Sequence, residues 1–373
     1  MSAPLVLVTG GAGFIGSHTV DLLTARGYRV RVLDSLQPRV HPRGKPEWVP
    51  SGVDFRQGLV ENRDDLARAL EGVEAVFHLA AYQDYMPDFS TFLHVNAEST
   101  ALLYELILER RLGVRKVVVA SSQAVAGEGK YECSEHGVVY PGPRPVEQLE
   151  RGDWEVKCPQ CGRDARPLPI DESVCRPHTA YGVSKLAAET LALALGRRYG
   201  IPSVAMRYTY VQGPRNSFYN AYSGACRIFS LRVLARQPPI VYEDGRQLRD
   251  FLDVADVARA NLLALEDARA DYRVFNVGPG RALTVLEFAR VVLEAAGSSL
   301  EPLVSGEFRL GDTRHTVSDV TALASLGWRA EIPIEQTVAR YLEWIRGFSD
   351  TRQYLEAAQA AMRSSGVIRR ATV

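Results

Sequence analysis

Short runs of continuous apolar character alternate with longer amphipathic stretches through the first 208 residues. The predicted strands are residues 5–9, 29–34, 75–80, 116–120 and 203–208. Between them, residues 17–26, 97–111 and 184–199 have the apolar spacing of helices. Continuous apolar strands suit a parallel sheet that is covered on both faces. The pattern therefore predicts an α/β protein with a Rossmann, doubly wound parallel sheet.

Two polar segments interrupt this alternation. Residues 127–169 are rich in proline, glycine and charge, and they contain Cys158-Pro-Gln-Cys161-Gly. We interpret about 127–170 as an insertion between a strand and the following helix. Residues 213–224 are rich in asparagine, serine and tyrosine and are typical of a binding loop.

A glycine-rich loop follows the first predicted strand and opens the first helix. It reads Thr-Gly10-Gly-Ala-Gly13-Phe-Ile-Gly16. Glycines at this spacing permit a tight turn, close approach of a pyrophosphate and close helix packing. Asp34 ends the second strand, 18 residues after Gly16. A carboxylate there accepts hydrogen bonds from a ribose and repels a 2′-phosphate, so the sequence predicts NAD rather than NADP.

Tyr181 and Lys185 are four residues apart in a predicted helix, so their side chains share one face. We expect the ammonium of Lys185 to favour the phenolate and lower the pKa of Tyr181. Such a tyrosine takes a proton from a sugar or alcohol hydroxyl near neutral pH. Ser122, at the end of a predicted strand, is the third member of this set.

With the glycine loop, Ser122, Tyr181 and Lys185 in place, residues 4–345 resemble the extended short-chain dehydrogenase/reductases, in particular the nucleotide-sugar epimerases and dehydratases. The supporting matches are His78-Leu79-Ala80-Ala81, Asn96, 207–215, Arg249-Asp250-Phe251, Asn276-Val277-Gly278 and Leu326-Gly327-Trp328. The resemblance implies tightly held NAD, a nucleotide-sugar substrate (dTDP-, UDP- or GDP-hexose) and a homodimer.

The resemblance also implies a division of the chain. The NAD-binding Rossmann domain is expected over residues 1–208, carrying the insertion, and again at about 246–268. Residues 209–245 and 269–345 are expected to form a smaller α/β domain for the nucleotide sugar. Residues 346–373 are expected to form a helical tail.

Site roles are carried over from the family to matching positions. Tyr181 is expected to be the base, Lys185 to bind the nicotinamide ribose, and Ser122 to hydrogen-bond the reacting oxygen. The expected cofactor site consists of Gly10, Gly13, Phe14, Ile15, Gly16, Asp34, Leu59, Ala80, Ala81, Gln83, Asn96, Tyr181 and Lys185. The expected substrate site consists of Ser122, Gln123, Asn220, Arg249, Arg309 and Arg314.

The residues after Ser122 separate the reactions of the family. Its 4,6-dehydratases carry Asp-Glu there, whereas this chain has Gln123 and Ala124, neither of which transfers a proton. Epimerisation at C4 needs only Tyr181 and NAD, so it is the favoured prediction. The alternative is a dehydrogenase or reductase with net redox change, and a dehydratase is less favoured. A third hypothesis is a protein without catalytic activity that senses NAD or a nucleotide.

The Gln-Ala-Val-Ala-Gly and Cys-Pro-x-Cys-Gly stretches are similar to a bacterial subgroup that includes dTDP-L-rhamnose 4-epimerase-like enzymes.

The cysteine pair of the insertion has the spacing of a zinc knuckle, which supplies two of four ligands. We expect a structural zinc site at Cys133, Cys158, Cys161 and Cys175, with His136 and His178 as alternative ligands. The competing interpretation is a surface loop with reduced thiols.

The composition argues against nucleic acid and membranes as binding partners. Lys plus Arg equals Asp plus Glu at 44 each, so no net charge favours nucleic acid or an anionic membrane. No apolar run reaches the length of a membrane span. The five cysteines are an odd number and no secretion signal is evident, so a cytoplasmic location is expected.

Overall fold

The computed structural model describes residues 3–84, 87–219, 224–349, 351, 354–356, 366 and 368–372. A seven-stranded sheet forms its centre, in the order β14-β9-β5-β4-β1-β2-β3, with every neighbouring pair parallel. The strands are β1 (Leu5–Thr9), β2 (Arg29–Asp34), β3 (Asp54–Gln57), β4 (Ala75–His78), β5 (Lys116–Ser122), β9 (Ser203–Tyr208) and β14 (Val274–Val277). The predicted Rossmann sheet is confirmed.

Alternate residues of the strands supply two separate cores. Val6 and Val8 of β1 pack on one face of the sheet, against α1 (Phe14–Ala25) and α8 (Val254–Glu266). Leu5 and Leu7 pack on the other face, against α2 (Arg63–Ala69), α4 (Ser99–Glu109) and α6 (Ala180–Tyr199). Continuous apolar runs are needed because both faces are covered.

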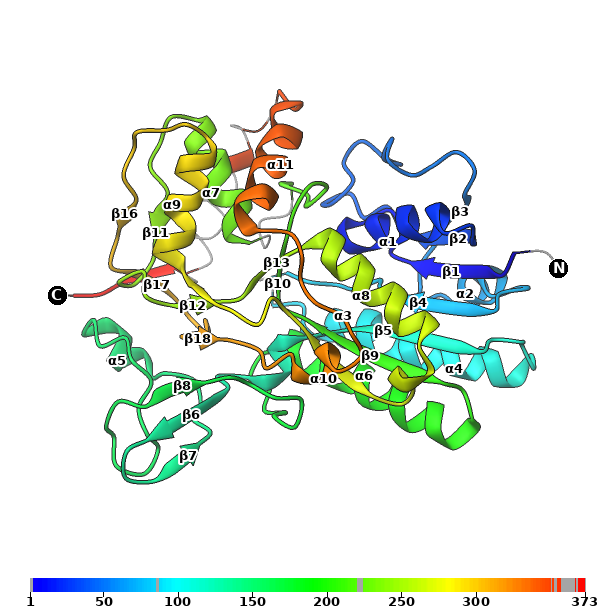
Figure 1. The fold of residues 1–373 in the computed structure, drawn as a ribbon, viewed down its shortest axis with the longest axis horizontal. Helices are drawn as coiled ribbons and strands as arrows, with labels where there is room; N and C mark the ends of the chain where they lie inside the picture. The colour runs from blue at the N-terminus through cyan, green and yellow to red at the C-terminus, as the bar shows by residue number, and fades with distance from the viewer. Residues whose placement is uncertain are drawn as a thin grey trace.

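A smaller unit packs beside the carboxyl ends of these strands (Figure 1). Helices α7 (Ala225–Leu234), α9 (Val285–Ala295) and α11 (Ile334–Arg346) surround its core. Its short strands are β10 (Tyr210–Gln212) with β13 (Phe251–Asp253), β12 (Leu248–Arg249) with β15 (Leu283–Thr284) and β18 (His315–Thr316), β11 (Ile240–Val241) with β16 (Leu303–Val304), and β17 (Glu307–Arg309) with β19 (Ile368–Arg370).

Two predicted boundaries differ from the structure. Residues 269–345 were assigned to the smaller domain, but β14 is an edge strand of the large sheet, and α10 (Thr321–Ala324) and Trp328 pack into the core under α8. The helical tail is also only partly correct. Residues 354–356 are helical, but the last described residues form β19, antiparallel to β17.

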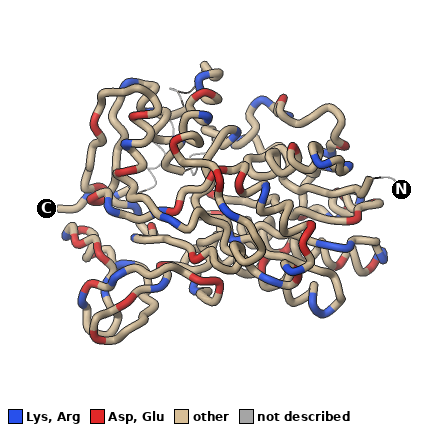
Figure 2. Tube along the Cα trace, viewed as in Figure 1, with Lys and Arg blue, Asp and Glu red and all other residues tan. Residues whose placement is uncertain are grey.

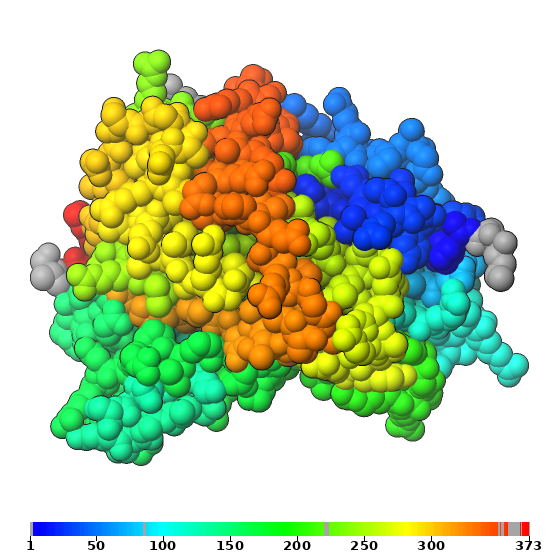
Figure 3. Space-filling view, viewed as in Figure 1, coloured from blue at the N-terminus to red at the C-terminus, as the bar shows by residue number. Residues whose placement is uncertain are grey.

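The insertion forms a lobe of its own. Its strands β6 (Lys130–Cys133), β7 (Gly137–Val139) and β8 (Arg166–Leu168) make an antiparallel sheet, accompanied by α5 (Val146–Glu150). Figure 3 shows the lobe protruding below the smaller unit. The remaining short helices are α3 (Phe89–Phe92), η1 (Leu93–Glu98), η2 (Gln123–Ala126) and η3 (Ala268–Ala270).

Figure 2 shows that the positions of Lys and Arg and those of Asp and Glu are interspersed along the trace of the chain. Within the described ranges, every helix is too short or too polar to cross a membrane.

Candidate active site

A cavity of about 400 Å³ lies where the large sheet meets the smaller unit. Strands β5 and β9 point into it with their carboxyl ends, and the α1 N-terminus supplies Phe14 and Ile15. The opposite wall comes from β10, β12, β17 and the loop that leads to β18. Ligands of open α/β sheets bind at this edge. The cavity therefore brings together the predicted catalytic, cofactor and substrate segments.

Ser122 and Tyr181 meet at the floor of the cavity and share a hydrogen bond. Ser122 is the last residue of β5, and its hydroxyl accepts a hydrogen bond from the Ala124 backbone at 3.2 Å. Tyr181 stands in the first turn of α6, which begins with Thr179 as a side-chain N-cap, 3.0 Å from the Gly182 nitrogen. A cap of this kind fixes where the helix starts and thus where Tyr181 points.

Gly182 permits the close approach of α6 to the turn after β5. A Cβ at this position would lie 2.6 Å from the Ala124 carbonyl oxygen, well inside van der Waals contact. Any side chain at Gly182 would therefore push Tyr181 away from Ser122. The sequence analysis missed this role, because one glycine within a helix does not show which neighbour requires it.

Burial dominates the electrostatics of the tyrosine–lysine pair. It raises the pKa of Tyr181 to about 12, against a lowering by the Ser122 hydrogen bond. It also lowers the pKa of Lys185 to about 8. The Lys185 ammonium donates to the Ala120 carbonyl at 2.9 Å and lies 6.0 Å from the Tyr181 ring centroid. The pKa of Tyr181 is therefore raised, in contrast to the lowering by Lys185 that the sequence analysis expects.

The glycine loop fits a dinucleotide. A Cβ at Gly16 would lie 2.1 Å from the Gly10 oxygen, so only glycine allows this tight turn into α1. Among the described residues, no side chain caps the α1 N-terminus, whose N–H groups face the cavity region beside Phe14. Asp34 ends β2, and its carboxylate accepts hydrogen bonds from the Ala12 and Leu36 nitrogens, both at 2.9 Å. The uncapped N–H groups at the N-terminus of α1 are suited to bind the phosphate oxygens of the dinucleotide.

The other predicted cofactor residues divide into two groups. Gln83 lines the cavity, whereas Ala80 and Ala81 continue from β4 beside Gly10. Asn96 lies behind the lining. Its amide binds the Tyr82 nitrogen at 2.8 Å and the Ser184 hydroxyl at 2.9 Å, which fastens the loop after β4 to α6.

Leu59 is 43% exposed, and its backbone nitrogen donates to the Asp65 carboxylate at 3.0 Å. The Asp65 carboxylate therefore lies beside Leu59, which was expected to contact the cofactor. The sequence analysis did not single out Asp65, because Asp65 comes from the helix after the loop.

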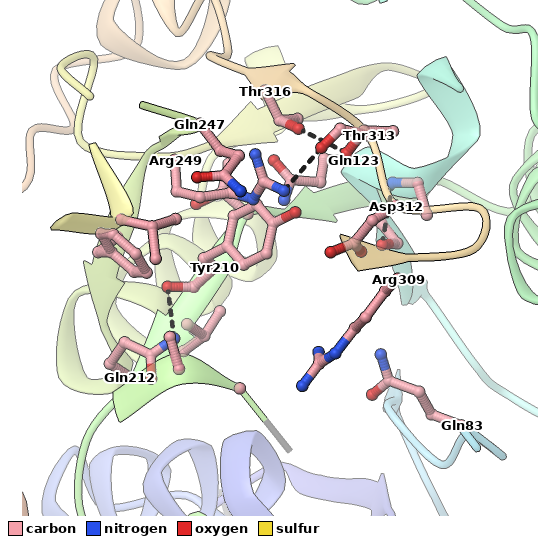
Figure 4. A pocket seen from close by; sticks show the side chains of 18 of the residues that line it. Gln83, Gln123, Tyr210, Gln212, Gln247, Arg249, Arg309, Asp312, Thr313 and Thr316 are labelled. Atoms are coloured by element: carbon pink, nitrogen blue, oxygen red, sulfur yellow. Dashed lines mark hydrogen bonds between the residues drawn. The ribbon is translucent and has the colours of Figure 1, made fainter. Parts of the chain in front are cut away.

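Two predicted arginines line the substrate side. Arg309 extends into the cavity toward Gln83 (Figure 4) and stacks on Tyr242, with 4.9 Å between its guanidinium carbon and the ring centroid. Arg249 lies 5.0 Å from the Tyr210 ring centroid and donates to the Thr313 carbonyl at 2.7 Å. Gln123 lines the cavity as well, while Asn220 lies outside the described residues.

Arg314 is not placed as predicted. Its side chain is fully buried, and it forms ion pairs with Glu155, Glu243 and Asp244 at 2.6 to 2.8 Å. These carboxylates raise the pKa of Arg314, although burial opposes them. Its charge is neutralised in the protein interior, so Arg314 has a structural role in the cavity wall.

Arg232 of α7 lines the cavity but was not predicted. It is buried, and its Nε donates to the Pro238 carbonyl at 2.6 Å. Apolar periodicity predicts the helix but gives no sign that an arginine faces a ligand cavity.

The structure brings three of the four predicted metal ligands together and places the fourth elsewhere. Cys133, Cys158 and Cys161 gather in the lobe together with His136. Cys175 lies elsewhere, because its Sγ accepts a hydrogen bond from Arg207 at 3.0 Å. His178, the other alternative, lies on the cavity lining.

The model of the NAD dependent epimerase/dehydratase family matches residues 6–145 and 159–278. The chain belongs to this family. The gap between the two matched segments, residues 146–158, falls within the lobe. The glycine loop, Ser122 and Tyr181 all lie in matched segments.

Family members of similar sequence are nucleotide-sugar enzymes. The dTDP-L-rhamnose 4-epimerase of Burkholderia thailandensis is 33% identical, over 91% of this chain and 94% of its own. A putative UDP-glucose 4-epimerase of Methanocaldococcus jannaschii is 30% identical, over 93% of this chain and all of its own.

Solved structures of the family share the fold. Thermus thermophilus UDP-glucose 4-epimerase, in complex with NAD, has a TM-score of 0.72 and 31% identity, covering 92% of this chain and all of its own. Thermotoga maritima UDP-glucose 4-epimerase, with UDP-glucose, has a TM-score of 0.75 and 29% identity, covering 92% of this chain and 99% of its own. The chain is an NAD-dependent enzyme of this family.

Proposed function

We propose that this chain epimerises a nucleotide-linked hexose at C4 through a transient 4-keto sugar. One observation carries the proposal: Ser122 and Tyr181 are hydrogen-bonded in the cavity lining, and the two positions after Ser122 hold Gln123 and Ala124, neither of which transfers a proton. The family relatives named above as 4-epimerases support it.

The proposed chemistry needs one proton site at O4. Tyr181 accepts the O4 proton when the keto sugar forms and returns it when the alcohol is regenerated. Ser122 donates a hydrogen bond to the same oxygen and holds it beside the tyrosine. When bound, NAD supplies the hydride acceptor and donor, and its nicotinium charge favours the phenolate of Tyr181.

The cavity favours epimerisation over dehydration. A 4,6-dehydratase must also move protons at C5 and C6, which requires an acid and a base beyond Tyr181. Gln123 and Ala124 occupy the lining next to Ser122, and neither an amide nor a methyl group transfers protons at neutral pH.

The arginines of the opposite wall fit a nucleotide diphosphate. Arg309 extends into the cavity toward Gln83, and Arg249 lies in the lining beside Gln247 and Tyr210 (Figure 4). A guanidinium binds phosphate oxygens with a fork of N–H donors, so two arginines hold a diphosphate in one orientation. UDP and dTDP sugars, as named for the relatives, are the first candidates.

We also propose that the enzyme works in the cytoplasm as a homodimer that pairs the α4 and α6 face. Leu108 on α4 and Val183 on α6 are 37% and 45% exposed, which supports a covered face. Size-exclusion chromatography with light scattering tests this: a monomer at micromolar concentration would refute the dimer.

Proton NMR of nucleotide sugars tests the reaction directly. UDP-glucose and dTDP-L-rhamnose are each incubated with the protein as purified, with no NAD added. We expect one of them to reach equilibrium with its C4 epimer, and Tyr181→Phe to slow this by about 10²- to 10⁴-fold. Tyr199→Phe, at the exposed end of the same helix, is the matched control and should keep full activity.

Two results would refute the proposal. Tyr181→Phe turning over at the wild-type rate would remove the assigned base. Net NADH formation without an epimer, only when NAD is supplied, would make the enzyme a dehydrogenase.

A further inference from the structure

Four potential metal ligands converge in the lobe, at the far side from the catalytic tyrosine. The ligand atoms of Cys133, His136, Cys158 and Cys161 all lie within 4.8 Å of one another. The Cys133–Cys161 sulfur separation is 3.6 Å, and the His136 Nδ1 is 3.6 Å from both the Cys133 and the Cys158 sulfur. All three cysteines are free thiols.

We propose that these four residues bind a structural zinc ion. In a tetrahedral site with Zn–S of about 2.3 Å and Zn–N of about 2.0 Å, sulfurs lie about 3.8 Å apart and sulfur and nitrogen about 3.6 Å apart. The three observed separations of 3.6 Å match this geometry. Three thiolates and one imidazole form a closed site that suits zinc, and with four protein ligands no position is open for catalysis.

The four ligands come from two backbone turns of similar sequence, and each turn supplies two of them. Cys133 and His136 belong to a Cys-x-x-His-Gly stretch, and Cys158 and Cys161 to a Cys-x-x-Cys-Gly stretch. Each ends in a glycine with positive φ, +63° at Gly137 and +73° at Gly162, which turns the chain back on itself. The first turn joins β6 to β7, and the second is closed by the Gly162 nitrogen donating to the Cys158 carbonyl at 2.9 Å.

The two turns face one another, so the two ligands of each turn surround one common point. Zinc ribbons and related structural sites are built in this way. The arrangement also explains why His136, and not Cys175, completes the set, because Cys175 lies beyond the sheet of the lobe and belongs to neither turn.

The lobe needs a cross-link because its own core is small. Its apolar cluster has six buried residues, two of which are the ligands Cys133 and Cys158. A unit of this size rarely stays folded through apolar burial alone, and metal binding is one of the usual solutions. Burying two unbonded thiols next to a histidine has no comparable benefit without a metal.

The lobe in turn supports the cavity wall. Arg144 donates to both oxygens of Glu243 and to the Asp312 carbonyl at 3.1 Å, and Asp312 lines the cavity. Glu155 receives the Arg314 guanidinium at 2.6 Å and His315 at 3.1 Å. Zinc would therefore hold the structure behind the loop that follows Arg309.

Metal analysis of the purified enzyme tests the site independently of activity. We expect about one zinc per chain by inductively coupled plasma mass spectrometry, after purification without added metal or chelator. Cys158→Ser and Cys161→Ser should each lower the zinc content at least fivefold, whereas Cys175→Ser, the matched control outside the cluster, should keep it. Less than about 0.1 zinc per wild-type chain, in protein that remains folded by circular dichroism, would overturn the proposal.

Cobalt replacement distinguishes a tetrahedral thiolate site from adventitious binding, and it works even where a zinc-free variant misfolds. The wild type refolded with Co²⁺ should show the strong visible absorption of tetrahedral cobalt and a thiolate charge-transfer band. His136→Cys should retain the metal, with both bands changed by the fourth thiolate. Weak octahedral absorption, unaffected by His136→Cys, would refute the assigned ligands.

Discussion

At the residue scale, burial shifts the pKa of each member of the catalytic pair toward its neutral form. The pKa of Tyr181 is raised to about 12 and that of Lys185 lowered to about 8. A base must lose its proton near neutral pH, so another positive charge is required beside Tyr181. The glycine loop places the cofactor site at the same cavity, and the nicotinium ring supplies that charge when NAD is bound.

This argument predicts that NAD changes the ionisation of Tyr181. Tyrosine labelled with ¹³C at Cζ is followed by NMR from pH 6 to 10.5, and the Tyr181 signal is assigned by its loss in Tyr181→Phe. We expect the Tyr181 signal to stay that of the protonated phenol over this range in the NAD-free chain, and to show a midpoint within the range, at least two units below about 12, in the NAD-bound enzyme. Identical titration in both forms would mean that the cofactor does not tune the base.

Asp250 gives a second prediction at this scale, on stability. Its carboxyl group is fully buried and accepts from the Ser318 nitrogen at 3.0 Å, and burial raises its pKa to about 7. In the unfolded chain the group ionises near its ordinary value of 3.8. Between these values the native state holds more protons, so its contribution to the free energy of unfolding falls as pH rises.

Asp250→Asn removes this titration and keeps an oxygen for the Ser318 N–H. The variant's free energy of unfolding, relative to wild type, should therefore increase between pH 4.5 and 7.5 by on the order of 1 kcal/mol or more. Urea denaturation of both proteins at the two pH values measures this. A pH-independent difference would show that Asp250 ionises normally.

Individual residues were predictable from the sequence where several signals coincided. Ser122 and Tyr181 came from spacing and family pattern, and the cavity brings them together. Arg314 was assigned to the substrate site as a third candidate beside Arg249 and Arg309, but its three carboxylate partners come from distant segments of the chain. His136 was ranked below Cys175 because only the fold shows which turn faces the cysteine pair.

At the element scale, two glycines determine how the helices of the site approach the sheet: Gly16 in α1 and Gly182 in α6. Gly16→Ala would force a Cβ to within 2.1 Å of the Gly10 oxygen, which neither backbone segment can relieve locally. We expect the melting temperature to fall by several degrees and the protein to be isolated largely without NAD, as measured by absorbance after acid release. Gly113→Ala is the control, since nothing lies within 4 Å of its added Cβ; an equal loss of NAD in both would contradict the assignment.

Strands were predictable where both faces are buried, because the apolar run is then continuous. β1 and β5 are buried throughout and were recognised. β3 is only half-buried at the sheet edge and reads Asp-Phe-Arg-Gln, so its sequence has no such run. β19 pairs with β17 far earlier in the chain, a tertiary contact that overrides the local helical pattern of the tail.

At the scale of the whole molecule, the lobe, the smaller unit and the large sheet meet around one cavity. Glu155 is the link on the lobe side, and hydrogen bonds from His315 and Arg314 lower its pKa to about 2. Because Glu155 lies behind the loop at 312–314, we interpret it as a residue that positions this part of the cavity wall. The sequence could not predict this link, because it joins positions about 160 residues apart.

Glu155→Gln should therefore weaken substrate binding more than it slows the chemistry. We expect KM for the nucleotide sugar to rise about threefold to tenfold, near 1 kcal/mol, with kcat changed less than twofold. Glu132→Gln is the control, because Glu132 is exposed on the lobe and pairs with Arg166. A fall in kcat without a change in KM would place Glu155 in the catalytic step instead.

The fate of the hydrogen at C4 tests the central claim most directly. The substrate is labelled with deuterium at C4 and converted by the enzyme as purified, without added NAD, and the product is examined by NMR and mass spectrometry. The account predicts a C4 epimer that retains the deuterium at C4, because the same hydride leaves and returns within one bound complex. Loss of the label, or accumulation of a 4-keto sugar without an epimer, would contradict it.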